Sequence, residues 1–227
     1  MSSVLDAATT KTAQSGTKPT LHVSDNALNL ILAFEGFDKG GWPGGASGCT
    51  IGYGYDLGYH TLGEFAAAWR TRLSVNDFAK LRALVGIKGT RARDRVRVLG
   101  GVNVPKQAAR EVFATFSIPR AADNTLSAFP GVENLPADAA GALVSLVYNR
   151  GPRLSDNDPQ LQERREMRAI REAVAAGDLM EIANELRSMV RLWTGKGLDG
   201  LISRREAEAA LVESCIPGAP PWKLPIT

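Results

Sequence analysis

The chain has 227 residues, 44% hydrophobic and 22% charged, which is the composition of a globular protein that can bury a full core. Its formal net charge of +3 is too small to indicate nucleic-acid binding, although a mildly basic surface suits contact with an anionic polymer. No apolar run approaches the ~20 residues of a membrane span, and Cys49 and Cys215 indicate neither a disulfide framework nor a metal cluster. We therefore expect no stable membrane insertion, no metal and no cofactor.

The two ends of the chain differ in composition from the rest. Residues 1–22, rich in Ser, Thr, Ala and Lys, predict a disordered leader that lacks the basic and apolar regions of a secretory signal. Residues 216–227 are rich in proline and predict an extended tail. Between them, residues 23–215 form one domain, which is large enough for two lobes.

The first predicted helix begins after Ser24, a good N-cap, and ends at Gly36, a natural C-terminal stop. Glu35 takes the next position of its apolar stripe, so we expect the carboxyl group to point toward the core side. The stripe consists of Leu28, Ile31 and Leu32.

Glu35 would then lie at the negative end of the helix dipole, flanked by Phe34 and Phe37. Both surroundings disfavour the ionised form, so we expect Glu35 to hold a proton near neutral pH, as a general acid must. The alternative is an ordinary helix-end glutamate that reaches water or pairs with a neighbouring arginine.

Residues 48–58 predict a β-hairpin with an unusual amount of glycine. Strand-forming residues alternate with glycines that leave little side chain to pack, as expected where a ligand lies against the backbone. Asp56, at the far end, should stay ionised, and Glu35 with Asp56 would form the acid and carboxylate pair of a glycoside hydrolase. The alternatives are an Asp56 that caps a turn and a Thr50 that is merely a strand residue.

The rest of the chain is predicted to be mainly helical. Helices start at the capping box Thr61-Leu62-Gly63-Glu64, at Ser74 and at Pro105, and Pro119 should end or kink the third. A break at residues 129–131 precedes a helix over residues 136–148 that is apolar almost all round and therefore buried. Three amphipathic helices follow, over residues 161–176, 179–192 and 201–212.

We assign no functional role to two charged features of the sequence. Arg204 with Glu208, like Arg168 with Glu172, has the spacing of an ordinary i,i+4 ion pair within a helix. The densest basic cluster is interpreted as a solvated face, and it consists of Lys88, Arg91, Arg93, Arg95 and Arg97.

Two short stretches carry a resemblance to a known family. They are Ala33-Phe34-Glu35-Gly36-Phe37 and Thr50-Ile51-Gly52-Tyr53-Gly54, and they resemble the catalytic motif of phage-type lysozymes. In those enzymes the second carboxylate precedes the Thr, at a place that Gly44 holds here. In the pesticin-like branch it follows the Thr, at the spacing of Asp56. The resemblance thus implies Glu35, Thr50 and Asp56 as catalytic residues, with Asp38 as the weaker substitute for Asp56.

A second region of resemblance is residues 143–151, which look like the central helix and cleft edge of these muramidases, and residues 200–208 look like their final segment. The whole resemblance spans residues 24–213. It implies that Tyr53, Tyr148, Asn149 and Arg150 bind the sugar. The alternative for Asn149 and Arg150 is a helix end that stops at Gly151.

The resemblance implies a mainly α (α+β) lysozyme-like fold, with a small lobe that carries the hairpin, a larger helical lobe and a cleft between them. It also implies an N-acetylmuramidase, in which Glu35 donates the proton, Thr50 holds water and Asp56 positions water or offsets positive charge. A chitinase, a chitosanase, a lytic transglycosylase and a wall-binding module without chemistry remain alternatives.

The biological setting follows only from this resemblance. The expected partner is peptidoglycan, and the expected state is a monomer made in the cytoplasm. Without a secretory signal, the protein would reach the periplasm or wall by another route. A phage endolysin, a delivered antibacterial toxin and a wall-remodelling enzyme all remain open, and a toxin would also need an immunity protein.

Overall fold

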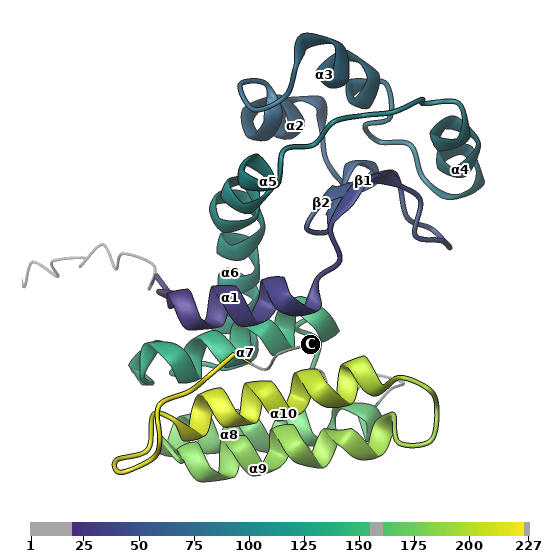
Figure 1. The fold of residues 1–227 in the computed structure, drawn as a ribbon. Coiled ribbons are helices and arrows are strands. Elements are labelled where there is room, and N and C mark those ends of the chain that lie inside the picture. Colours follow the sequence, from purple (N-terminus) through teal and green to yellow (C-terminus); the bar gives the residue numbers. More distant parts are fainter. Residues whose placement is uncertain (1–19, 155–160, 225–227) are drawn as a thin grey trace, which may run out of the picture.

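The computed structural model describes residues 20–154 and 161–224, and it has two lobes (Figure 1). The small lobe contains a three-stranded sheet and three short helices, and the large lobe is a bundle of helices. Each lobe has its own cluster of buried apolar residues. The predicted class, mainly α with a small β part, is confirmed. Most of the expected leader lies outside the described residues, and Leu21 already packs in the large-lobe core.

Helix α1 (Asp25–Phe34) is capped as predicted, because the Ser24 hydroxyl accepts a hydrogen bond from the amide of Ala27 at 3.1 Å. Its buried face differs from the predicted stripe. Leu28 and Leu32 are only half-buried. The fully buried members are Ala27, Leu30 and Ile31.

The sheet is antiparallel in the order β1 (Asp38–Gly41), β2 (Thr50–Gly52) and β3 (Tyr55–Asp56). The predicted hairpin is β2 and β3, in which Thr50 pairs with Asp56. The β1 strand was not predicted, because its sequence Asp-Lys-Gly-Gly contains no strand-forming residue. It forms because β2 offers it an open edge.

The small lobe continues with the predicted helices α2 (Leu62–Trp69), which begins with the expected capping box, and α3 (Val75–Arg82). A further helix, α4 (Gly89–Arg97), was predicted only as a charged surface segment. Ala92 is its one buried residue, which agrees with a solvated basic face.

A long helical segment joins the lobes (Figure 1). It runs from α5 (Lys106–Val112) through a π-helical turn (Phe113–Ser117) into α6 (Ile118–Ala128). The prediction was that Pro119 ends or kinks this helix; the helix does not end there, although its regular α-helical pattern is interrupted just before Pro119. Pro119 lies in the first turn of α6, where its missing amide hydrogen costs little, and the π turn carries the chain past it.

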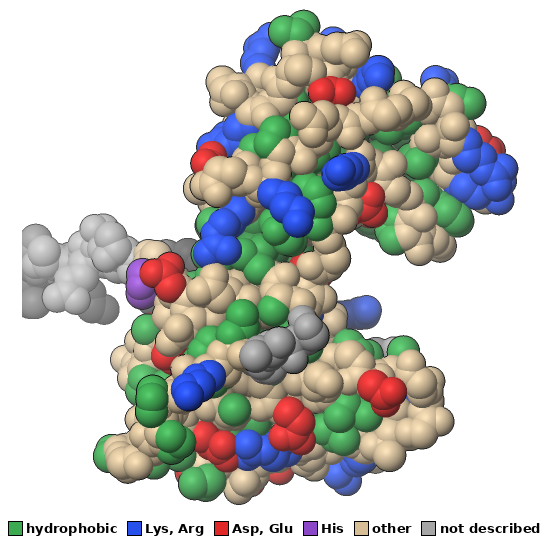
Figure 2. Space-filling view, viewed as in Figure 1, with side chains coloured by type: hydrophobic (Ala, Val, Ile, Leu, Met, Phe, Trp, Pro, Cys, Tyr) green, Lys and Arg blue, Asp and Glu red, His purple; other side chains and the backbone are tan. Residues whose placement is uncertain are grey.

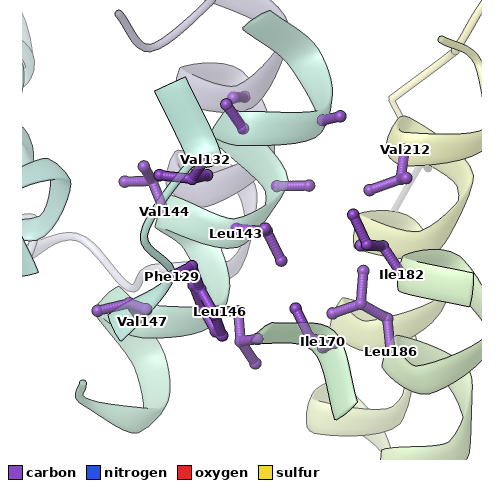
Figure 3. Packing of buried hydrophobic residues seen from close by; sticks show 14 of the residues in the cluster. Phe129, Val132, Leu143, Val144, Leu146, Val147, Ile170, Ile182, Leu186 and Val212 are labelled. Atoms are coloured by element: carbon purple, nitrogen blue, oxygen red, sulfur yellow. The ribbon is translucent and has the colours of Figure 1, made fainter. Parts of the chain in front are cut away.

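Helix α7 (Ala137–Arg150) is the buried centre of the large lobe, and every residue from Ala139 to Val147 is buried. It packs against α1, α6 and α10 (Asp199–Glu213), while α8 (Arg165–Ala176) and α9 (Leu179–Ser188) complete the bundle. Leu143 and Leu146 point from α7 toward Ile170 and Ile182 of that layer (Figure 3). The predicted helices are therefore confirmed, with short 3-10 turns at residues 161–164 and 189–192.

The tail beyond α10 has no helix or strand in its described part, and Trp222 packs back against the large-lobe core. Over residues 20–154 and 161–224, no helix is both long enough and apolar enough to cross a membrane.

Helices α1 and α7 approach so closely that Gly141 has no room for a side chain. A Cβ atom at residue 141 would lie 2.3 Å from the Cβ atom of Ala27. We expect Gly141→Ala to lower the free energy of unfolding by about 2 kcal/mol, because neither backbone can move without disturbing the core. Urea unfolding measures this. Gly63→Ala in α2 is the control, since its Cβ atom would meet only Thr61 Oγ1 at 3.9 Å, and equal losses in both variants would contradict the prediction.

Candidate active site

The surface is deeply hollowed between the two lobes (Figure 2), and Glu35 lies where the chain crosses from one lobe to the other. Glu35 is the C-cap of α1, with an extended backbone that sends the chain toward β1. Its side chain is 20% exposed. It lines an open pocket together with Asn149, Leu198 and Arg204. The carboxyl group is thus reachable by a ligand in this pocket.

The hairpin over residues 48–58, which we call the glycine ribbon, passes directly beside this carboxyl group. A Cβ atom built on Gly54 would lie 4.0 Å from Glu35 Oε2 and 2.8 Å from Tyr148 Oη. Gly54 also has a φ of 78°, which an L side chain rarely adopts. The ribbon therefore needs glycine at this position both for its turn and because the Tyr148 hydroxyl occupies the place of a side chain.

The other oxygen of Glu35 is held by an arginine. Nη1 of Arg204, from α10, donates a hydrogen bond to Glu35 Oε1 at 2.7 Å, and the Arg204 side chain is only 3% exposed. The apolar surroundings expected for Glu35 are therefore incomplete, and its pairing with an arginine, the alternative interpretation, is observed. Arg204 therefore does more than form the i,i+4 pair with Glu208 that its spacing predicted.

Arg204 belongs to a buried network that joins α1, α7 and α10. Glu208 Oε1 accepts hydrogen bonds from the Ser145 hydroxyl at 2.5 Å, from Arg205 Nη2 at 2.7 Å and from Arg204 Nε at 3.3 Å. Arg204 Nη2 also donates to the Ser145 carbonyl. Glu208 and Arg205 are fully buried, and burial lowers the pKa of Arg205 to about 10. The charges of this network stabilise one another in a low dielectric.

Asp56 has a structural task in the ribbon. Its carboxylate accepts hydrogen bonds from the backbone amides of Gly48, at 2.9 and 3.0 Å, and Gly58, at 2.8 Å. It caps the 3-10 turn at residues 57–59, so the alternative interpretation as a cap residue is observed. Thr50 is its cross-strand neighbour, and side chains at paired positions project to the same face of a sheet.

Asp38, the substitute candidate, lies on the neighbouring strand and accepts a hydrogen bond from the amide of Gly40 at 3.1 Å. Burial raises the pKa of the Cys49 thiol to about 12, and the charges of Asp38 and Asp56 add to the effect. Cys49 therefore stays protonated between the two carboxylates and is a poor nucleophile.

Of the four expected sugar-binding residues, Tyr148 and Asn149 lie beside Glu35. The Tyr148 hydroxyl donates to the Tyr53 carbonyl at 3.3 Å and so bridges the lobes. Burial, and next the charge of Glu35, raise the pKa of Tyr148. Asn149 is exposed and lines the Glu35 pocket.

The other two expected residues have different surroundings. The Tyr53 ring packs edge-on against Phe37, with ring centroids 5.4 Å apart, and against Phe113, at 6.1 Å. Arg150 donates to the Glu163 carbonyl at 2.8 Å and lies over the ring of Trp193. It lines an adjoining pocket, to which Asn149 also contributes. In the described part of the chain, no three His, Cys, Asp or Glu side chains are grouped so that they could hold a metal ion.

A comparison with protein families agrees with this geometry. The family model described as phage lysozyme matches residues 32–208, a range that includes Glu35, the ribbon, the end of α7 and the Arg204 network. No curated protein matches the chain.

Arg204→Ala should be strongly destabilising, because it leaves Glu208 and the Ser145 hydroxyl buried with fewer partners. We expect a loss of about 3 kcal/mol in the free energy of unfolding, measured with urea. Arg187→Ala is the matched control, since Arg187 pairs with Glu206 and Glu213 from a half-exposed position and should cost about 1 kcal/mol or less. A smaller loss for Arg204→Ala than for Arg187→Ala would refute a structural role of the network.

Proposed function

The chain belongs to the phage lysozyme family, whose members are peptidoglycan-lytic enzymes, and from this premise we propose that it is an N-acetylmuramidase. It hydrolyses the β-1,4 bond between N-acetylmuramic acid and N-acetylglucosamine, and so lyses the bacterial cell wall from the periplasm. The observation that carries the proposal is the position of Glu35, with Oε1 on Arg204 and Oε2 beside the glycine ribbon.

Glu35 is the proton donor in this mechanism. A guanidinium only donates hydrogen bonds, so Glu35 Oε1 must accept from Arg204 and the acidic proton must reside on Oε2. Oε2 is the oxygen nearest to Gly54, at the junction of the ribbon with the Tyr148 hydroxyl. The proton is therefore aimed at the glycosidic oxygen of a strand that lies over the ribbon.

Thr50 and Asp56 act on the sugar from the ribbon. Thr50 orients the attacking water, and its partial exposure supports this role. Asp56 contributes negative charge that offsets the positive charge of the oxocarbenium-like transition state. Because both oxygens of Asp56 already accept backbone hydrogen bonds, its contribution is electrostatic and does not include proton abstraction.

The sugar rings are held by residues at the end of α7. Tyr148 and Asn149 contact the ring next to Glu35, and the Asn149 amide suits an acetamido group. Tyr53 and Arg150 support this surface, Tyr53 through its carbonyl bond to Tyr148 and Arg150 through the adjoining pocket.

Glu35→Gln should reduce lysis of permeabilised Gram-negative cells by at least about 100-fold, because the amide cannot donate the proton. The fragments released by the unmodified protein should have masses that include one added water per cleaved bond. Glu172→Gln, an exposed acid on α8, is the control and should keep full activity. Unchanged lysis by Glu35→Gln, anhydro ends in the products, or binding of walls without solubilisation would each overturn the proposal.

Comparison of Asp56→Asn with Asp38→Asn identifies the second carboxylate. An asparagine at residue 56 keeps a carbonyl oxygen for the backbone amides but loses the charge. We expect kcat to fall about 100-fold in Asp56→Asn and less than about threefold in Asp38→Asn, with both proteins folded by circular dichroism. The reverse order would assign the role to Asp38.

A further inference from the structure

A second pocket adjoins the Glu35 site at the contact between the lobes. Gly54 and Tyr148, which flank Glu35, also line this pocket. Its other walls come from His60 in the small lobe and from Arg120 and Asn124 of α6 in the large lobe. A strand that lies over Gly54 with one linkage at Glu35 thus has this pocket within reach of its neighbouring groups.

The pocket offers hydrogen-bond donors and one positive charge. None of its lining residues is Asp or Glu, whereas Arg120, Asn124 and Ser117 all present N–H or O–H groups. Arg120 is exposed, and its guanidinium is in no ion pair with an acid of residues 20–154 or 161–224. The arrangement suits a planar anion, because a guanidinium binds a carboxylate through two parallel hydrogen bonds.

The groups around Arg120 leave its guanidinium available to bind an anion. Glu64 is an acid whose charge reaches this region, but its Oε2 already accepts from the Thr61 amide at 2.7 Å and from the Thr61 hydroxyl at 3.0 Å. Burial lowers the pKa of His60, and Arg120 adds to this lowering against the opposing effect of Glu64. His60 is therefore neutral at pH 7, and Arg120 supplies the charge of the pocket.

The volume of this pocket limits the size of the group that it can bind. The pocket measures about 240 Å³, which is below the usual size of a site for a whole small molecule. It has room for a substituent of a sugar ring. N-acetylmuramic acid carries such substituents, either a lactyl carboxylate or a stem peptide that ends in carboxylates.

We infer that this pocket binds a carboxylate of the peptidoglycan strand, and that Arg120 is a specificity-determining residue that selects carboxylate-bearing strands. The inference rests on the proposed muramidase function. It extends the recognised substrate from the cleaved linkage to an anionic group on a neighbouring sugar.

The test compares the unmodified protein with Arg120→Gln and Arg120→Lys on soluble, sonicated peptidoglycan. We expect Arg120→Gln to raise KM about tenfold with kcat nearly unchanged, because a charge-assisted hydrogen bond is lost only in binding. Arg120→Lys keeps the charge and should recover part of the affinity. Arg82→Gln, an exposed arginine on α3, removes the same charge away from the cleft and should change KM less than twofold.

The substrate is varied to identify the group. Once the carboxylates of the strand are converted to methylamides, the unmodified protein and Arg120→Gln should have the same KM. Strands stripped of peptides by an amidase keep a free lactyl carboxylate. If the KM difference between the unmodified protein and Arg120→Gln persists on these strands, the bound group is the lactyl carboxylate. If the KM difference is lost, the bound group belongs to the stem peptide. A KM difference that persists on the methylamidated strand would overturn the inference.

Binding to the same soluble fragments is also measured in the Glu35→Gln background, with and without Arg120→Gln. This readout needs no turnover, so it separates the two proposals. If Arg120→Gln weakens binding tenfold but the unmodified protein hydrolyses nothing, the muramidase proposal is wrong and the inference about the pocket stands. If the two Kd values are equal and the unmodified protein is active, only the inference about the pocket is wrong.

Discussion

The whole site depends on one hydrogen bond, in which a buried guanidinium holds one oxygen of the Glu35 carboxyl group. Arg204 binds Glu35 Oε1 and leaves Oε2 facing the glycine ribbon. The arginine itself is fixed by Ser145 and Glu208, so three helices of the large lobe determine the orientation of the Glu35 carboxyl group. Burying charged groups costs free energy, so a network of this kind contributes little net stability. Its role is better explained by the orientation that it gives to Glu35.

Local signals in the sequence predict most of the fold. The Ser24 cap, the capping box at Thr61 and the apolar run in α7 each identify an element, because each satisfies its own backbone groups or buries its own face. The alternating glycines identify the ribbon for a related reason, since a strand with so little side chain has to lie against something else. The position of Glu35 beside that ribbon follows from these two elements.

Interactions between distant segments explain what sequence reasoning missed. The β1 strand forms because β2 has a free edge, and the helix continues through Pro119 because a π turn precedes it. Arg204 has the spacing of an ordinary i,i+4 pair, and only the packing of α10 against α7 buries it. Asp56 is a catalytic candidate by spacing, whereas the structure adds its bonds to Gly48 and Gly58. The sequence did contain a signal for Arg204, since the exposed polar row of α10 includes Asp199, Ser203 and Glu206, and Arg204 does not belong to it.

The central claim is that the proton on Glu35 Oε2 meets a glycosidic oxygen over Gly54. A crystal structure of Glu35→Gln with a bound peptidoglycan oligosaccharide tests it most directly. The account predicts a bridging oxygen about 3 Å from the residue 35 amide, with the sugar backbone lying across Gly54. An oligosaccharide seated in the cleft with every linkage out of reach of residue 35 would contradict it.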